Sequence, residues 1–112
     1  MAVTIYHNPK CSKSRATLEL LSQRGVEPVV VEYLKTPFSV ADLKRILKLL
    51  GMRPRDLLRA KEAKEAGLDP NLSDDALLNA MVKNPLVIER PVVVAGNKAA
   101  LGRPPENVLK IL

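Results

Sequence analysis

The stretch "AVTIYHNPKCSKSRATLELLSQRGVEPVVVEYL", residues 2 to 34, decides the fold. Residues 2 to 6 mix β-branched and aromatic types and stop before an Asn-Pro turn signal, which predicts a short buried strand. Residues 11 to 24 contain no Gly or Pro, and Gly25 follows where a left-handed cap is favoured, so we expect a helix there. The apolar residues 28 to 34 predict a second strand, buried on both faces.

A strand, a helix and a second strand in this order form a βαβ unit. Such a unit makes the two strands parallel, with the helix crossing between them in the right-handed sense. Ligands of these units collect at the carboxyl ends of the strands. The residues at that end of the first strand are 7 to 11, which contain the only histidine and the only cysteine of the chain.

The middle of the chain is expected to be helical. Ser39 and Asp42 have the spacing of a capping box, and the apolar stripe that follows them ends at Gly51. Ser73, followed by two acidic residues, begins another helix, which ends before Pro85. Two less regular segments lie between them, a short helix opened by Pro54 that runs through Arg59 and a mixture of helical turn and loop over residues 60 to 71.

The last third of the chain predicts strands again. Residues 90 to 101, "RPVVVAGNKAAL", contain a branched apolar run and a Gly-Asn turn, which is typical of an antiparallel hairpin. Two prolines at 104 and 105 then open a terminal helix, with Val108, Leu109 and Leu112 packed on the sheet. The whole order predicts one α/β domain over residues 1–112 with a thioredoxin-like fold: a mixed four-stranded sheet flanked by helices, with a helical insertion between its βαβ and ββα parts.

The composition limits the partners. Eighteen Lys and Arg against twelve Asp and Glu give a net charge of +6, which favours an anionic partner but does not choose among anions. Three aromatic residues cannot build a base-stacking platform, so no nucleic acid is expected, although a duplex-binding helix would need no aromatic rings. No segment has the length of a membrane span or a signal peptide, and we expect a cytoplasmic protein without a membrane partner.

Cys11 is the candidate nucleophile. A single cysteine cannot form an internal disulfide or a multi-cysteine metal site, so no metal is expected. In the first turn of a helix, unpaired backbone N–H groups and the helix dipole favour the thiolate, and we expect Lys10, Lys13 and Arg15 to act in the same direction. Ser14 stands where a dithiol reductase has its second cysteine, so the reaction needs an outside thiol.

Other readings of these residues stay open at this point. Lone cysteines are mostly buried and inert. His7 either tunes the thiolate or only stabilises the nearby backbone. Most surface arginines only face solvent, but Arg90 and Arg103 each precede a proline at the end of an element, where binding sites form, and paired guanidinium donors suit an oxyanion.

Four segments together resemble the glutaredoxin-dependent arsenate reductase family, and specifically its short bacterial members. They occur in the same order over essentially the whole chain: "IYHNPKCSKSR" (5–15), "DLLRAKE" (56–62), "NPLVIERPVVV" (84–94) and "LGRPPENVL" (101–109).

The resemblance implies a role for each matching residue. Cys11 would be the nucleophile, His7 would help to keep it ionised, and Arg59, Arg90 and Arg103 would surround the oxyanion. The resemblance also implies a cis peptide bond before Pro91, glutathione as a co-substrate with no bound cofactor, and glutaredoxin as a partner.

Two alternatives remain beside reduction of arsenate to arsenite. One is a glutathione-dependent thiol reductase of other substrates, which would need Cys11 but tolerate loss of Arg59. The other is a non-enzymatic redox or transcription-linked binding protein on the same fold, which the positive charge would support.

Overall fold

The computed structural model describes residues 2–69 and 71–112 of the chain. The chain divides into two compact units, here called the sheet unit (Met1–Thr36 with Arg90–Leu112) and the helical unit (Pro37–Glu89). The helical unit is the insertion that the sequence predicts between the βαβ and ββα parts. The single domain predicted over residues 1–112 stays a prediction.

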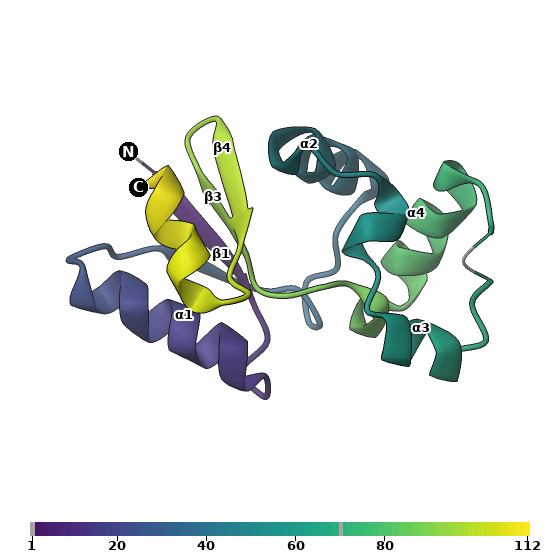
Figure 1. Cartoon of the computed structure of the whole chain (residues 1–112), viewed down its shortest axis with the longest axis horizontal. Helices are drawn as coiled ribbons and strands as arrows, with labels where there is room; N and C mark the ends of the chain where they lie inside the picture. The colour runs from purple at the N-terminus through teal and green to yellow at the C-terminus, as the bar shows by residue number, and fades with distance from the viewer. Residues whose placement is uncertain (1, 70) are drawn as a thin grey trace. The chain divides into compact units, whose positions relative to one another are not determined.

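The sheet unit contains the mixed four-stranded sheet, which confirms the predicted fold class (Figure 1). The strand order is β2-β1-β3-β4. Strands β1 and β2 are parallel, whereas β1 with β3 and β3 with β4 are antiparallel, as the βαβ unit and the hairpin predict. The four strands are β1 (Val3–His7), β2 (Val29–Glu32), β3 (Val92–Ala95) and β4 (Lys98–Leu101).

Strand β2 differs from its prediction. Its apolar run predicts burial on both faces, but Val29 and Val30 are 62% and 45% exposed. The reason is its position at the edge of the sheet, beside β1. Strand β3, which lies between two strands, is buried at all four positions.

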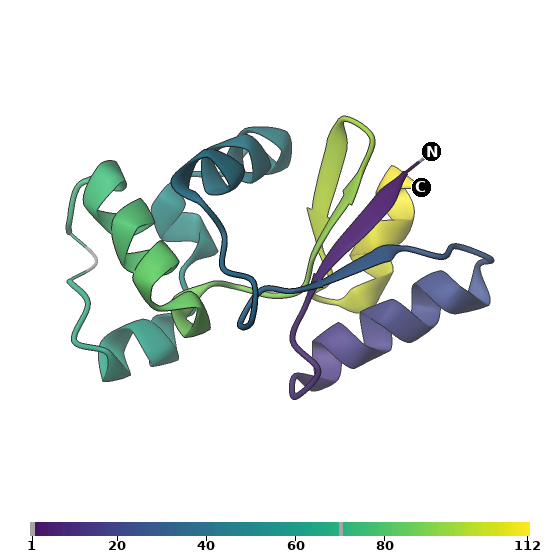
Figure 2. The ribbon, with the colours of Figure 1, turned by 180° about the vertical axis from the view of Figure 1, so that it is seen from behind.

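One face of the sheet packs against two helices, α1 (Ser12–Gln23) and the terminal 3₁₀ helix η3 (Pro105–Ile111), which lie side by side in Figures 1 and 2. The terminal helix corrects a second prediction, because Leu112 is 40% exposed while Ile111 is buried. In a 3₁₀ helix residues three apart lie on the same face, so Val108 is followed on the buried face by Ile111. The shared core consists of Val3, Ile5, Leu21, Val93, Ala95, Val108 and Ile111.

The helical unit begins as predicted. Ser39 and Asp42 form the capping box of α2 (Val40–Leu50), and Gly51 ends that helix in the left-handed conformation at φ 68°. Ser73 caps α4 (Asp74–Lys83) by accepting a hydrogen bond from the Ala76 N–H. The remaining elements are η1 (Pro54–Leu57), α3 (Ala60–Glu65) and η2 (Pro85–Val87).

The helix opened by Pro54 stops at Leu57 rather than running through Arg59. Leu58 is extended instead and forms an isolated antiparallel bridge with Ile88. This bridge joins the middle of the helical unit to its C-terminal end. None of the helices in residues 2–69 and 71–112 is long and apolar enough to cross a membrane.

Candidate functional site

Cys11 lies at the junction between β1 and α1. Its N–H donates to the Asn8 carbonyl at 3.0 Å, which closes a tight turn after the strand, and its own carbonyl accepts the Arg15 N–H at 3.0 Å. Cys11 is therefore the N-cap residue of α1, with φ −93° and ψ 122°, and its side chain is half-buried. The strand, turn and helix around the thiol form as the sequence predicts.

The surroundings of Cys11 stabilise its thiolate. Burial is the largest single influence and raises the pKa of the thiol. The Ser14 and Lys13 N–H groups and the Arg90 guanidinium favour the charged sulfur, and the positive charge of Arg90 adds to their effect on the pKa. Together these groups outweigh burial and hold the pKa of Cys11 below its ordinary value.

The charged group that acts on the thiol is not one of those expected from the sequence. Lys13 acts through its backbone N–H, and the cation that lowers the pKa of Cys11 is Arg90, from the far end of the chain. The side chains of Lys10, Lys13 and Arg15 are exposed. Arg15 turns back to the loop, where its Nη1 donates to the Pro9 carbonyl at 3.0 Å.

A buried polar network supports the turn. His7 Nδ1 lies 2.6 Å from Ser14 Oγ, and the Asn8 N–H donates to the same hydroxyl at 3.0 Å. Burial is the main cause that lowers the pKa of His7, with Arg15 acting in the same direction and Glu32 opposing it, so the imidazole stays neutral near pH 7. Ser14 is a fully buried residue of α1. Its hydroxyl contacts His7 at the end of β1 and Asn8 in the turn, so it links the strand, the turn and the helix.

His7 contacts the Ser14 hydroxyl, and the Ser14 N–H is one of the groups that lower the pKa of Cys11. This arrangement makes His7 a positioning residue of the turn. The stronger role that the resemblance implies, keeping the thiol ionised, stays a prediction. Asn8 was not identified from the sequence, although an Asn before Pro often hydrogen-bonds the backbone two residues on, and its Oδ1 accepts the Lys10 N–H at 3.0 Å.

Two of the three predicted arginines, Arg90 and Arg103, belong to the same unit as Cys11. Arg90 is half-buried, and its Nε and Nη1 are buried without a hydrogen-bond partner in the part of the chain that the structure describes. Arg103 Nη1 donates to the Arg90 carbonyl at 3.0 Å. The peptide bond before Pro91 is cis, the isomer that the resemblance implies, and the bond before Pro104 is cis as well. Arg90 thus offers buried donors beside the thiol.

Gly102 allows the backbone before Arg103 to lie close to Pro91 and Thr17. Its N–H donates to the Pro91 carbonyl at 2.9 Å, and a Cβ on Gly102 would lie only 2.8 Å from Pro91 Cγ and would also collide with the buried Thr17 side chain. Only a glycine fits this space without a shift of its neighbours. The signal in the sequence is a glycine directly before an Arg-Pro pair, "LGRPP".

Arg59, the third predicted arginine, belongs to the helical unit. It is the N-cap residue of α3, its N–H donates to the Val87 carbonyl at 2.7 Å, and its Nε lies 3.0 Å from Glu62 Oε2. These contacts define its backbone position and one ion pair. Its place beside the other two arginines stays a prediction.

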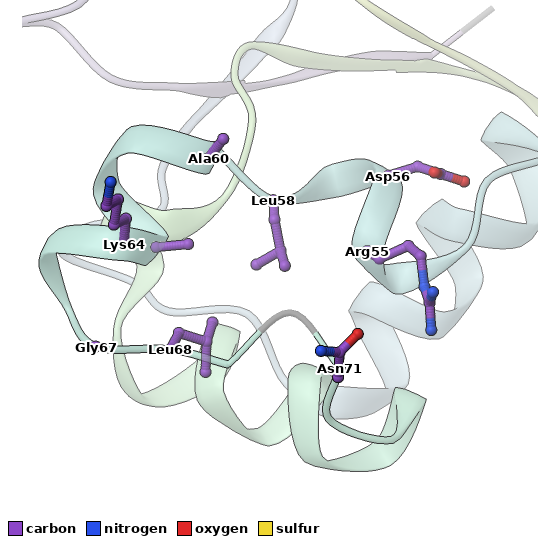
Figure 3. A pocket seen from close by; sticks show the side chains of 9 residues that line it. Arg55, Asp56, Leu58, Ala60, Lys64, Gly67, Leu68 and Asn71 are labelled. Atoms are coloured by element: carbon purple, nitrogen blue, oxygen red, sulfur yellow. The ribbon is translucent and has the colours of Figure 1, made fainter.

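The helical unit also contains a pocket of about 670 Å³ that includes none of the predicted site residues (Figure 3). Leu58 and Leu68 point into it, and Ala60 and Ala63 add to its apolar lining. An oxyanion needs convergent donors rather than apolar walls. None of Cys11, Arg59, Arg90 and Arg103 lines this pocket, although two of its lining residues flank Arg59 in the chain.

Similar proteins agree with this picture. The fold and the single thiol define the class: a thioredoxin-like α/β protein with one cysteine, at the start of its first helix. A solved structure from Vibrio cholerae, an arsenate reductase, superposes with a TM-score of 0.94 at 53% identity and covers 100% of this chain and 98% of that one. Residues 6–111 match the ArsC family, and the chain belongs to that family.

Relatives in two further organisms match over at least 97% of their length. An arsenate reductase of Neisseria meningitidis serogroup A is 50% identical, covering 98% of this chain and 97% of its own. An arsenate reductase of Haemophilus influenzae is 47% identical over the full length of both chains. The resemblance seen in the four sequence segments is therefore confirmed at the level of the family.

Proposed function

We propose that this protein reduces arsenate to arsenite, with Cys11 as the nucleophile. The observation that carries the proposal is a thiol whose pKa is lowered by Arg90, a residue whose Nε and Nη1 are buried without a partner in the described residues. A thiolate beside guanidinium donors suits a tetrahedral oxyanion, because the fork matches paired oxygens at fixed charge. Membership of the ArsC family and the names of the relatives support this choice.

The reaction uses three thiols. The Cys11 thiolate attacks As(V) and forms an S–As bond, and a hydroxyl leaves as water. The thiol of glutathione displaces a second hydroxyl in the same way. A glutaredoxin thiolate then attacks the glutathione sulfur, the electron pair of that S–As bond reduces arsenic to As(III), and glutaredoxin leaves as a mixed disulfide. Water finally hydrolyses the Cys11–As(III) bond, which releases arsenite and restores the thiol.

The side chains have distinct parts in this scheme. Arg90 binds the oxyanion beside the sulfur, and Arg103 holds the Arg90 backbone and adds its own charge. Arg59 supplies a third cation for the oxyanion. Glutathione acts as a co-substrate, so no bound cofactor is needed, and a reducing cytoplasm would keep Cys11 available.

The test is a coupled NADPH assay that compares arsenate with a model mixed disulfide. Cys11→Ser should lower arsenate turnover by at least about a thousandfold, because the covalent step is lost. A variant that kept the parent rate would contradict the scheme.

Arg59→Ala separates this function from the alternatives in the same assay. An arsenate reductase should lose affinity for arsenate when Arg59 is replaced, whereas a general thiol reductase of mixed disulfides should be unaffected. A redox or transcription-linked binding protein should turn over neither substrate.

A further inference from the structure

The backbone around Arg59 is held by two hydrogen bonds inside the helical unit. The Arg59 N–H donates to the Val87 carbonyl at 2.7 Å, and the Glu89 N–H donates to the Leu57 carbonyl at 2.7 Å. These two bonds flank the isolated antiparallel bridge of this unit. Val87 and Leu57 are buried, so water does not compete for the bonds. The point from which the Arg59 side chain extends is therefore fixed, but so long a side chain needs a further contact to be held in one orientation.

Glu62 provides that contact, although its place in the helix predicts a different one. Glu62 is the third residue of α3, and an acid at this position often accepts the backbone N–H of the N-cap residue. Asp42 does so in α2, where it accepts the Ser39 N–H at 3.1 Å. In α3 the Val87 carbonyl takes the corresponding N–H, and Glu62 Oε2 lies 3.0 Å from Arg59 Nε. The carboxylate thus pairs with the guanidinium.

This ion pair is largely removed from water. The side chains of Arg59 and Glu62 are 19% and 23% exposed. The ion pair between Lys35 and Glu32 is longer, at 3.6 Å, and its side chains are 78% and 39% exposed. Water and salt weaken an exposed pair, whereas a largely buried pair is less screened, and the loss of one partner leaves an uncompensated charge. Of these two pairs, the one at Arg59 is therefore the one able to fix a side chain.

We propose that Glu62 is a positioning residue, which holds the Arg59 guanidinium in one orientation before the oxyanion arrives. Nε is the guanidinium nitrogen nearest the backbone, so the ion pair fixes the base of the fork that suits paired oxygens. A donor that is already oriented loses little further conformational freedom when its ligand binds. This inference rests on the proposed function, because it requires that Arg59 binds arsenate.

The opposite effect of Glu62 on arsenate binding would come from its charge. A carboxylate beside a cation reduces the positive potential that attracts an anion. If this effect were the larger one, removal of Glu62 would strengthen the binding of arsenate. Because positioning is the proposed role, removal of Glu62 should weaken the binding even though the unit becomes more positive. The direction of the change distinguishes the two roles.

The test measures KM and kcat for arsenate in the coupled assay. Glu62→Ala should raise the KM about tenfold with little change in kcat, because the orientation of Arg59 before binding is lost. Glu62→Gln keeps an acceptor at the same distance from the backbone without the charge, and should raise the KM only a few-fold. Glu65→Ala is the matched control and should keep the parent KM, since it removes the same charge from an exposed position of α3.

A double-mutant cycle connects the effect to the guanidinium. In the Arg59→Ala background, Glu62→Ala should cause no further rise in KM, because no guanidinium is left to orient. Circular dichroism of each variant checks that it is folded, and Glu62→Gln keeps the test decisive if Glu62→Ala does not fold.

A measurement without arsenate examines the ion pair itself. In heteronuclear NMR, the Nε–H proton of Arg59 should exchange with water more slowly than that of Arg24, whose side chain is exposed. Glu62→Ala should remove this protection, and Glu65→Ala should keep it.

The proposal would be overturned by an unchanged or lowered KM in Glu62→Ala, by an equal rise in Glu65→Ala, or by an undiminished rise in the Arg59→Ala background. An unprotected Nε–H proton in the parent would overturn it without reference to arsenate. Failure of the proposed function looks different, because the parent would then not turn over arsenate or Arg59→Ala would itself leave the KM unchanged.

Discussion

The sheet unit and the helical unit differ in what they bring to the chemistry. The sheet unit holds Cys11, every group that lowers its pKa, two of the three predicted arginines and most of the net charge. The helical unit holds Arg59 and a largely apolar pocket. In the proposed function, ionisation of the thiol therefore draws on the sheet unit alone, whereas recognition of the oxyanion draws on both units, and mutations in the helical unit can separate the two.

The largest expected effect comes from the arginines. Arg90→Ala and Arg59→Ala should each lower kcat/KM for arsenate by about 100- to 1000-fold, because each removes a donor to the oxyanion. Only Arg90→Ala should also raise the pKa of Cys11, since Arg90 is the charged residue that lowers this pKa. The pH dependence of alkylation by iodoacetamide measures that pKa. Arg24→Ala, an exposed position at the end of α1, is the control and should change neither quantity.

An equal rise of the Cys11 pKa in Arg59→Ala would break this comparison. It would mean that the helical unit also contributes to ionisation of the thiol.

The next effect concerns stability and asks whether the two units unfold together. Ile5 in the sheet unit and Leu77 in the helical unit are fully buried. Ile5→Ala and Leu77→Ala should each cost about 3 kcal/mol of unfolding free energy, through lost burial and the cavity left behind. If residues 1–112 are one domain, circular dichroism and the accessibility of Cys11 should report one shared urea transition in both variants.

Separate transitions in Leu77→Ala would contradict the single domain. Helical signal would then be lost at lower urea while Cys11 stayed protected. Leu77→Met is the matched control, because it nearly conserves volume and should cost much less.

Much of the fold follows from local signals in the sequence. The Asn-Pro turn after β1, the Ser39 capping box and the Gly51 cap depend on neighbouring residues, and each forms as predicted. The exposure of β2 was wrongly predicted because burial of a strand depends on its neighbours in the sheet. A run such as Val29–Val31 has the same apolar pattern whether its strand lies at the edge or at the centre of the sheet.

Less of the candidate site could be predicted from the sequence, because the site also depends on which strands are neighbours in the sheet. Cys11 could be identified locally, but its contact with Arg90 exists because β3 lies beside β1, an adjacency that no local periodicity encodes. From the sequence, Ser14 is only the residue that stands in place of a second cysteine. In the structure, its buried hydroxyl contacts the His7 ring and accepts a hydrogen bond from the Asn8 N–H. Arg59 was identified only through resemblance to a family.

A smaller effect is expected at that hydroxyl. Ser14→Ala leaves the Asn8 N–H and the His7 ring buried without their partner, which should cost about 2 kcal/mol of unfolding free energy. Ser12→Ala, on the exposed side of the same helical turn, should be close to neutral. Urea titration of both variants measures the difference. A cost as small for Ser14→Ala as for Ser12→Ala would show that the network does not stabilise the turn.

The smallest expected effect is a pH dependence that belongs to the sheet unit alone. The pKa of the Cys11 thiol is lowered in the folded protein and is about 8.5 in the unfolded chain. Between these two values the unfolded state binds more protons, so stability should rise with pH, level off above about 8.5 and be lost again as pH falls through the folded pKa.

Cys11→Ser lacks this titration, and all other groups, His7 included, are common to both proteins. The stability difference between the parent and Cys11→Ser, measured by urea unfolding at several pH values from 6.5 to 9, should therefore isolate the thiol. Arg90→Ala should shrink the pH-dependent gain, because it removes a donor and a charge that favour the thiolate. Arg59→Ala should retain it in full. A gain that disappears in Arg59→Ala would show that both units stabilise the thiolate, and the division of labour between them would no longer hold.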